Sequence, residues 1–299
     1  MHHTSRRAVI LLLILLLALP LLLSGCGSSA KYKDIAEKLS LMEANITQTE
    51  AICGKLTEIA DWQIKSSEES WKEYDEAFKN GTEGQLPDEN NDEEVQAKYD
   101  ELKVESDALA AIETSYSAGE ATGVAQFDET EQAYLSYIAD IRRSADDMQT
   151  MFQYYFNVRD AIKPMEEYEP VESTTGYTDY SLIAGQLSQV ISQTQKSLGQ
   201  IDYPTYMKGS HDALLQRMSE YQGLSQDLSE AMQLSDPLRM ASWFNRVSRL
   251  DIMLNECSRD LDDDFNLQFG RARDRVEGRV ASLRSELQNN ISALLNAIG

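Results

Sequence analysis

The chain has 299 residues, of which 50 are acidic and 27 are basic, so its formal net charge is −23. A chain this acidic lacks the basic footprint that phosphate contacts need, which argues against nucleic acid as a partner. The same charge repels most of the surface from an anionic lipid face.

The N-terminus has the order of a secretory leader. Arg6 and Arg7 precede an apolar run from Ala8 to Leu23, and the run leads into Leu23-Ser24-Gly25-Cys26. A retained membrane helix is the competing interpretation. Such a helix needs about 20 apolar residues, more than this run offers, and Pro20 interrupts the run.

These four residues resemble the lipobox of bacterial lipoproteins, in which a small-residue cleavage site is followed at once by cysteine. The resemblance implies that residues 1–25 are a signal peptide and that Cys26 becomes the lipidated N-terminus. It also implies at least two acyl chains, which hold a protein on a membrane more firmly than one. Residues 26–30 would then be a short tether on the extracytoplasmic face of the bacterial cell membrane.

After the leader, apolar residues recur at alternating steps of four and three, which predicts helices with coiled-coil-like packing. The first predicted helix extends from Ile35 to Phe78 and stops at Asn80-Gly81. At 1.5 Å per residue it is about 66 Å long, which is typical of an arm or stalk. Residues 81–94 predict an exposed loop, and a weaker helix follows from about Val95 to Tyr116.

Asp128 and Glu131 have the spacing of a capping box, so the next helix is expected to begin there. It should end at Pro164 and Pro170. Residues 169–177 are the expected hinge between two sequential halves. The N-terminal half, residues 31–168, is strongly acidic, and the C-terminal half, residues 178–299, forms a second helical bundle.

No segment alternates between apolar and polar residues like a strand. We therefore predict an all-α fold, an antiparallel bundle of about six to seven long helices. An α-solenoid is the minor alternative, because no repeat of 34 to 47 residues shares a signature. The Asp236-Pro237 pair is a clear helix start, with an N-cap residue followed by proline.

Two cysteines remain once Cys26 is lipidated. Cys53 and Cys257 are a candidate disulfide, since an even pair in an exported protein favours a bond. Both lie on apolar helical stripes, and that position equally fits two buried free thiols.

Aromatic residues concentrate between Phe152 and Tyr206, and tyrosine offers a large contact area with a polar tip. This region is the candidate surface for a ligand or partner. Its members are Tyr154, Tyr155, Tyr177, Tyr180, Tyr203, Tyr206 and His211. The alternative is that these side chains belong to the helical core and to the end of the bundle.

No metal site, cofactor or catalytic site is expected. His211 is the single histidine after the leader, and Leu214 and Leu215 occupy the positions where a helical metal site needs its second ligand. The acidic clusters at 88–94 and 260–264 lack the glycine and glutamate of a calcium-binding EF-hand loop. The arginines between Arg271 and Arg284 are expected to be neutralised within the chain, by the neighbouring acidic cluster at 262–264.

These observations favour a non-enzymatic, membrane-anchored extracytoplasmic lipoprotein. It is expected to act as a cell-envelope interaction or scaffold module through its helical surfaces, with a protein partner in the envelope. The alternative is an extracytoplasmic helical bundle that binds a small molecule or a metal ion. A deep pocket lined by the aromatic residues would favour that alternative, and a filled core would count against it.

Overall fold

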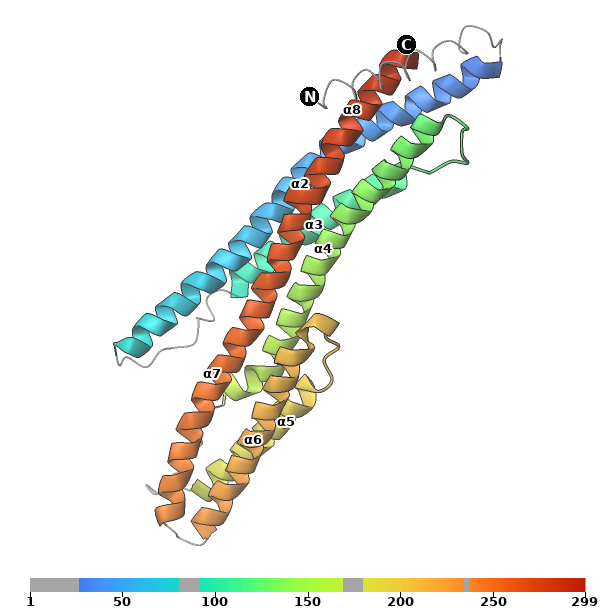
Figure 1. Ribbon diagram of the computed structural model, residues 1–299. Coiled ribbons are helices and arrows are strands. Elements are labelled where there is room, and N and C mark those ends of the chain that lie inside the picture. Colours follow the sequence, from blue (N-terminus) through green and yellow to red (C-terminus); the bar gives the residue numbers. More distant parts are fainter. Residues whose placement is uncertain (1–26, 81–91, 169–179, 234–236, 299) are drawn as a thin grey trace. The chain divides into compact units, whose positions relative to one another are not determined.

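The computed structural model describes residues 27–80, 92–168, 180–233 and 237–298. In these ranges all regular structure is helical and no strand occurs (Figure 1), so the predicted all-α class is confirmed. The α-helices of the described residues are α2 (Gly27–Lys79), α3 (Asp92–Ser115), α4 (Ala125–Glu166), α5 (Tyr180–Leu198), α6 (Lys208–Gln233), α7 (Pro237–Asp274) and α8 (Ala281–Ile298). The π-helix η3 (Arg275–Val280) joins α7 directly to α8, which leaves six continuous rods. This number lies in the predicted range.

The predicted signal peptide, residues 1–25, and Cys26 lie outside the described residues. Helix α2 begins at Gly27, so residues 27–30 of the predicted tether are helical. The helix therefore starts at the residue that follows Cys26 in the sequence. Among the described residues, none of the helices combines the length and the apolar character that crossing a membrane requires.

Helix α4 begins earlier than the Asp128 and Glu131 spacing predicts. It starts at Ala125, and the Asp128 carboxylate reaches back from the first turn. That carboxylate accepts hydrogen bonds from the backbone N–H groups of Thr122 at 2.9 Å and Gly123 at 3.1 Å. Gly123 has a φ of 71°, a conformation that a glycine adopts without strain. The predicted start is wrong because Asp128 satisfies the preceding turn from inside the helix.

The contacts divide the chain into two compact units. Unit 1 contains residues 27–59, 100–146 and 272–298, and unit 2 contains the described residues of 60–99 and 147–271. Helices α2, α3 and α4 each contribute to both units, so the units differ from the sequential halves 31–168 and 178–299. The physical reason is that such long helices extend beyond one packed core. The hinge expected at 169–177 lies outside the described residues.

Unit 1 is an up-and-down arrangement of four helical segments. Polar contacts between α2 and α4 join residues whose numbers rise together, so these two helices are parallel. Contacts of α4 with α3 and with the η3–α8 segment join rising to falling numbers, so these pairs are antiparallel. The contacts are Lys38–Glu131 and Thr49–Tyr137, Tyr116–Glu131 and Ser106–Arg142, and Asp140–Arg279 and Ser144–Arg275.

Two polar residues on the buried face of α2 meet tyrosines of α4 in the core of unit 1. The Asn45 amide donates to the Tyr134 hydroxyl at 2.8 Å, and the Thr49 and Tyr137 hydroxyls lie 2.7 Å apart. The Thr49 hydroxyl donates to the Ile46 carbonyl at 2.9 Å, so Tyr137 must be the donor to Thr49. All four polar side chains are buried. Each of these four side chains therefore has a hydrogen-bond partner in a part of the core that excludes water.

The η3 segment keeps the apolar stripe of the last rod facing the core. Ala272, Val276 and Val280 are buried in succession, and this spacing places eight residues in two turns, against about seven in a regular α-helix. The wider π-turn absorbs the extra residue. It also places Arg275 and Arg279 against α4.

Replacing Tyr137 with phenylalanine removes the hydroxyl that donates to Thr49 and leaves the ring in place. We expect the free energy of unfolding to fall by about 1 kcal/mol, the usual net contribution of a buried hydrogen bond. Urea denaturation followed by circular dichroism measures this change. Tyr32→Phe, a half-buried tyrosine in the first turns of α2, is the matched control, and an equal loss in both variants would contradict the assignment.

Candidate functional site

Three residues of the predicted aromatic surface, two of them buried and Tyr203 half-buried, form a stack in unit 2. His211, near the start of α6, is fully buried, and the Tyr203 ring stacks on it with ring centroids 4.3 Å apart. The Tyr154 hydroxyl from α4 lies 2.9 Å from His211 Nδ1. Phe265 of α7 packs against the Tyr154 ring at 5.7 Å. Side chains from three helices and the segment before α6 therefore meet around His211.

The stack holds a neutral histidine. Burial lowers the pKa of His211, although the Leu198 carbonyl and Asp212 act in the opposite direction. Burial raises the pKa of Tyr154 far above its usual range. At neutral pH the phenol keeps its proton and is hydrogen-bonded to His211 Nδ1. Nε2 has no hydrogen-bond partner of good geometry among the described residues.

Of the other members of the predicted surface, the structure describes the side chains of Tyr155 and Tyr206. Tyr155 is half-buried and contacts Phe265 at 6.1 Å between ring centroids, and Tyr206 is 38 % exposed. Tyr180 is the first residue of α5, and Tyr177 lies outside the described residues. The structure thus places Tyr154 and His211 in the core and leaves Tyr206 at the surface.

The acidic cluster at 260–264 divides its side chains between different partners. Asp264 accepts a hydrogen bond from the Ser210 hydroxyl at the start of α6. Asp262 accepts one from the Trp71 indole N–H at 2.7 Å. No group of three or more histidine, cysteine, aspartate or glutamate side chains in the described ranges is arranged to hold a metal ion.

In unit 2 the last turns of α2 lie antiparallel to α7 along a row of polar contacts. Residue numbers rise from Ser67 to Asp75 on α2 while they fall from Asn266 to Arg259 on α7, and Tyr74 contacts Asn255, one turn further along α7. The contacts are Ser67–Asn266 at 3.0 Å, Trp71–Asp262 at 2.7 Å, Asp75–Arg259 at 2.6 Å and Tyr74–Asn255 at 2.5 Å. The Arg259 guanidinium also lies 4.7 Å from the centre of the Trp71 ring. We call this row the α2–α7 ladder.

Within the α2–α7 ladder, Asp262 is a carboxyl group with a raised pKa. Burial raises its pKa to about 6, the Trp71 hydrogen bond opposes this shift, and the neighbouring Asp263 adds to it. A carboxyl with such a pKa changes its protonation between neutral and mildly acidic solution. Asp262 therefore makes this helix contact depend on pH.

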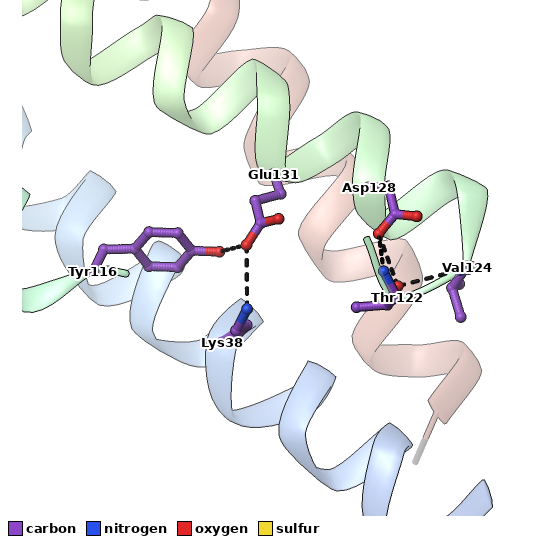
Figure 2. A network of polar contacts seen from close by, with 6 residues as sticks. All are labelled: Lys38, Tyr116, Thr122, Val124, Asp128 and Glu131. Atoms are coloured by element: carbon purple, nitrogen blue, oxygen red, sulfur yellow. Dashed lines mark hydrogen bonds and ion pairs between the residues drawn. The ribbon is translucent and has the colours of Figure 1, made fainter. Parts of the chain in front are cut away.

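Figure 2 shows a second polar network, in unit 1, at the connection between α3 and α4. Glu131 is buried, and one of its carboxylate oxygens accepts from Tyr116 at 2.6 Å and from Lys38 at 3.3 Å. Thr122 donates from its hydroxyl to Asp128 at 2.8 Å and accepts from the Val124 N–H at 3.2 Å. The network thus fixes the connection on both sides and joins it to α2.

Two of the arginines after α7 pair with carboxylates within unit 1, and a third donates to a hydroxyl. Arg275 donates to the Ser144 hydroxyl at 3.2 Å, Arg279 pairs with the buried Asp140 at 2.6 Å, and Arg284 of α8 pairs with Glu50 of α2 at 3.0 Å. The carboxylate partners come from α4 and α2 instead of the cluster at 262–264 that the sequence indicates. The apparent basic patch therefore serves helix packing.

Cys53 and Cys257 are both buried free thiols in this structure, in unit 1 and unit 2 respectively. Burial raises the pKa of Cys53 to about 11 and also raises that of Cys257. Neither is a reactive thiolate at neutral pH. The bond between them stays a prediction, which counting the free thiols of the unfolded, unreduced protein will decide.

The sequence pattern indicates some residues of these clusters and not others. Asn45 and Thr49 give a signal, because they are polar residues within an apolar stripe, and such residues need partners in the core. Asp262 gives none, since it looks like one of several solvated carboxylates. No protein-family model, curated protein or solved structure matches this chain significantly, so the interpretation depends on the geometry alone.

Asp262→Asn tests the pH dependence of the α2–α7 ladder. Because the folded-state pKa of Asp262 is raised from 3.8 to about 6, the folded state binds the proton first, and its stability falls as pH rises through that interval. The loss is about 2 to 3 kcal/mol once the carboxyl is ionised. Urea denaturation at pH 4.5 and 7, followed by tryptophan fluorescence, measures it.

The asparagine variant should lack this part of the pH dependence and gain stability at pH 7. Asp263→Asn, an exposed neighbour, is the matched control and should change little. A variant with the same pH profile as the wild type would show that Asp262 is not the titrating group.

His211→Gln tests the neutral histidine. Since burial lowers the folded-state pKa of His211 below its ordinary value of 6.5, acidification through pH 6.5 protonates the unfolded chain first and lowers the stability of the fold. Glutamine does not titrate, so the variant should lose this acid sensitivity. The comparison is made in the Asp262→Asn background, because Asp262 has the opposite dependence. Equal unfolding midpoints at pH 7.5 and 5.5 in the Asp262→Asn chain that keeps His211 would contradict the assignment.

Proposed function

We propose that this protein is a non-enzymatic lipoprotein, anchored on the extracytoplasmic face of a bacterial membrane, that acts as an interaction or scaffold module through its helical surfaces. The observation that carries the proposal is the position of Cys26. The residue follows Leu23-Ser24-Gly25, and helix α2 begins at the next residue. A lipid on Cys26 would be joined directly to a rigid rod and would hold that rod close to the membrane.

The use of the polar core residues supports a role by contact. Two buried groups of types that often serve catalysis are engaged in contacts between helices: Glu131 binds Lys38 and Tyr116, and His211 is hydrogen-bonded to Tyr154. The aromatic rings around His211 pack on one another. This packing favours the scaffold role over small-molecule binding.

The surface charge limits the partner. With 50 acidic and 27 basic residues, the exposed faces of the helices attract a basic or neutral protein surface and repel an anionic one. The proposed partner is therefore a protein of the cell envelope with a complementary, basic face. Nucleic acid does not fit this surface.

Cys26→Ser tests the anchor. The full chain with its leader is expressed in a bacterium, and membrane and soluble fractions are compared together with incorporation of a fatty-acid analogue. The wild type should incorporate the lipid and stay in the membrane fraction, whereas the variant should lose the lipid and leave that fraction. Cys53→Ser, at a buried position of α2, is the matched control and should behave like the wild type.

A Cys26→Ser chain that is still processed at the same position and still bound to the membrane would contradict the proposal. Retention without lipid would instead point to an uncleaved apolar leader as the anchor. Sequencing the N-terminus of the mature wild-type protein distinguishes these two outcomes.

A further inference from the structure

Two large apolar side chains are exposed in the described part of unit 1. Val104 on α3 is 64 % exposed, and Leu41 on α2 is 36 % exposed. The other exposed large apolar residues of the described chain belong to unit 2. Single apolar residues are common on a protein surface, so the surroundings of these two decide whether they belong to a patch.

Helices α2 and α3 run antiparallel in unit 1. The Asn45 amide of α2 donates to the Ser115 hydroxyl near the end of α3 at 3.3 Å. Further along α2, Lys55 interacts electrostatically with Glu101 and Glu105 of α3. Residue numbers therefore rise on α2 while they fall on α3, and these contacts fix the register of the pair.

This register places Leu41 near the end of α3 and Val104 beside the turn of α2 that carries Lys55. The two residues are about 20 Å apart along the helices. Between them, one line of exposed residues on each helix follows at steps of three and four and carries no charge. These residues are Ala44, Gln48 and Ala51 on α2 and Ala108 and Ala111 on α3. We call these five residues, together with Leu41 and Val104, the α2–α3 face.

The helices that carry the α2–α3 face hold most of the excess acid of unit 1. Residues 40–59 and 100–115 contain eight carboxylates and two lysines, a net charge of −6. The other described residues of unit 1 contain eleven carboxylates and nine basic side chains. Arg284 of α8 pairs with Glu50, and this contact leaves most of the negative charge in place. A basic partner is therefore attracted, whereas the same face of a second copy is repelled.

Carboxylates crowd at the end of the α2–α3 face near Val104. Glu101 and Glu105 lie one turn apart on α3, where like charges repel. Burial raises the pKa of Glu105, Lys55 opposes this shift, and Glu101 adds to it. Lys55 also pairs with Glu58 at 2.5 Å, so three carboxylates share its charge. A further cation beside Glu101 and Glu105 would relieve their repulsion.

We propose that the α2–α3 face binds one amphipathic helix of a basic envelope protein. The apolar side of that helix lies on the face, and its lysine or arginine side chains lie beside Glu101 and Glu105. This inference rests on the proposed scaffold role and gives its partner a binding surface. Alanine side chains allow two helix axes to approach to about 8 Å, and a partner segment of about 14 residues covers the length of the face.

The test uses the lipidated full chain in nanodiscs of zwitterionic phosphatidylcholine. The probe is a fluorescent helical peptide of about 18 residues, with leucine and alanine on one side and lysine on the other. Its counterpart has glutamate in place of lysine. Fluorescence anisotropy measures the Kd, empty nanodiscs correct for binding to lipid, and circular dichroism checks the fold of each variant. We expect the lysine peptide to bind and the glutamate peptide not to bind.

Ala108→Gln tests the apolar part of the contact. It adds a long uncharged side chain in the middle of the α2–α3 face, at an exposed helical position, and should raise the Kd of the lysine peptide about fivefold. Ser282→Gln adds a similar side chain at an exposed position of α8 and should leave the Kd unchanged.

Glu101→Gln with Glu105→Gln tests the charged part of the contact. Losing both carboxylates should raise the Kd about fivefold. Glu277→Gln with Glu286→Gln removes the same charge from exposed positions of η3 and α8 in unit 1 and should have little effect.

The outcomes separate this docking from the proposed anchor. Absence of binding by the lysine peptide overturns the docking. Equal weakening by the two charge pairs shows that net charge alone attracts the peptide, and an unchanged Kd in Ala108→Gln places the binding elsewhere, so each result also overturns it. None of these results affects the lipid anchor. A chain that does not stay with the nanodiscs overturns the anchor instead, and the peptide is then measured against the free chain.

Discussion

Paired polar side chains in the cores fix which residues of one helix face which residues of the next. An apolar stripe alone allows two helices to slide by one heptad, about 10 Å, with little loss of contact area. A buried Asn45 or Thr49 does not allow this, because each would lose its tyrosine of α4. Leaving such a group without a partner costs about 1 to 3 kcal/mol. The polar contacts therefore select one register.

Both units combine neutral hydroxyl and amide contacts with contacts of carboxyl groups, but carboxyl groups of the two units have different partners. In unit 1, Glu131 has both a lysine and a phenol as partners. Unit 2 uses the α2–α7 ladder, in which an indole donates to Asp262. A carboxylate that lacks a cationic partner in a buried place is partly protonated near neutral pH. Ionisation of Asp262 therefore weakens unit 2 as pH rises towards neutral, and protonation below its pKa of about 6 stabilises it.

Some charged side chains pair with residues of a neighbouring helix, and others stay on exposed helix faces. Inside unit 1, Arg279 pairs with Asp140 and Arg284 pairs with Glu50. Arg275 donates a hydrogen bond to the Ser144 hydroxyl. Most other carboxylates stay on exposed helix faces, where they keep the surface acidic.

The sequence by itself determined the all-α class, the end of α2 at Lys79, the start of α7 at Pro237 and the lipobox resemblance, because these follow from local periodicity and short motifs. Only the tertiary structure decided that α2, α3 and α4 serve two units, that Asp262 meets Trp71, and that Arg279 meets Asp140. These pairings join residues from 139 to 191 positions apart. A periodic stripe shows that a face is buried, but it does not specify the partner helix, since any apolar stripe can pack against another.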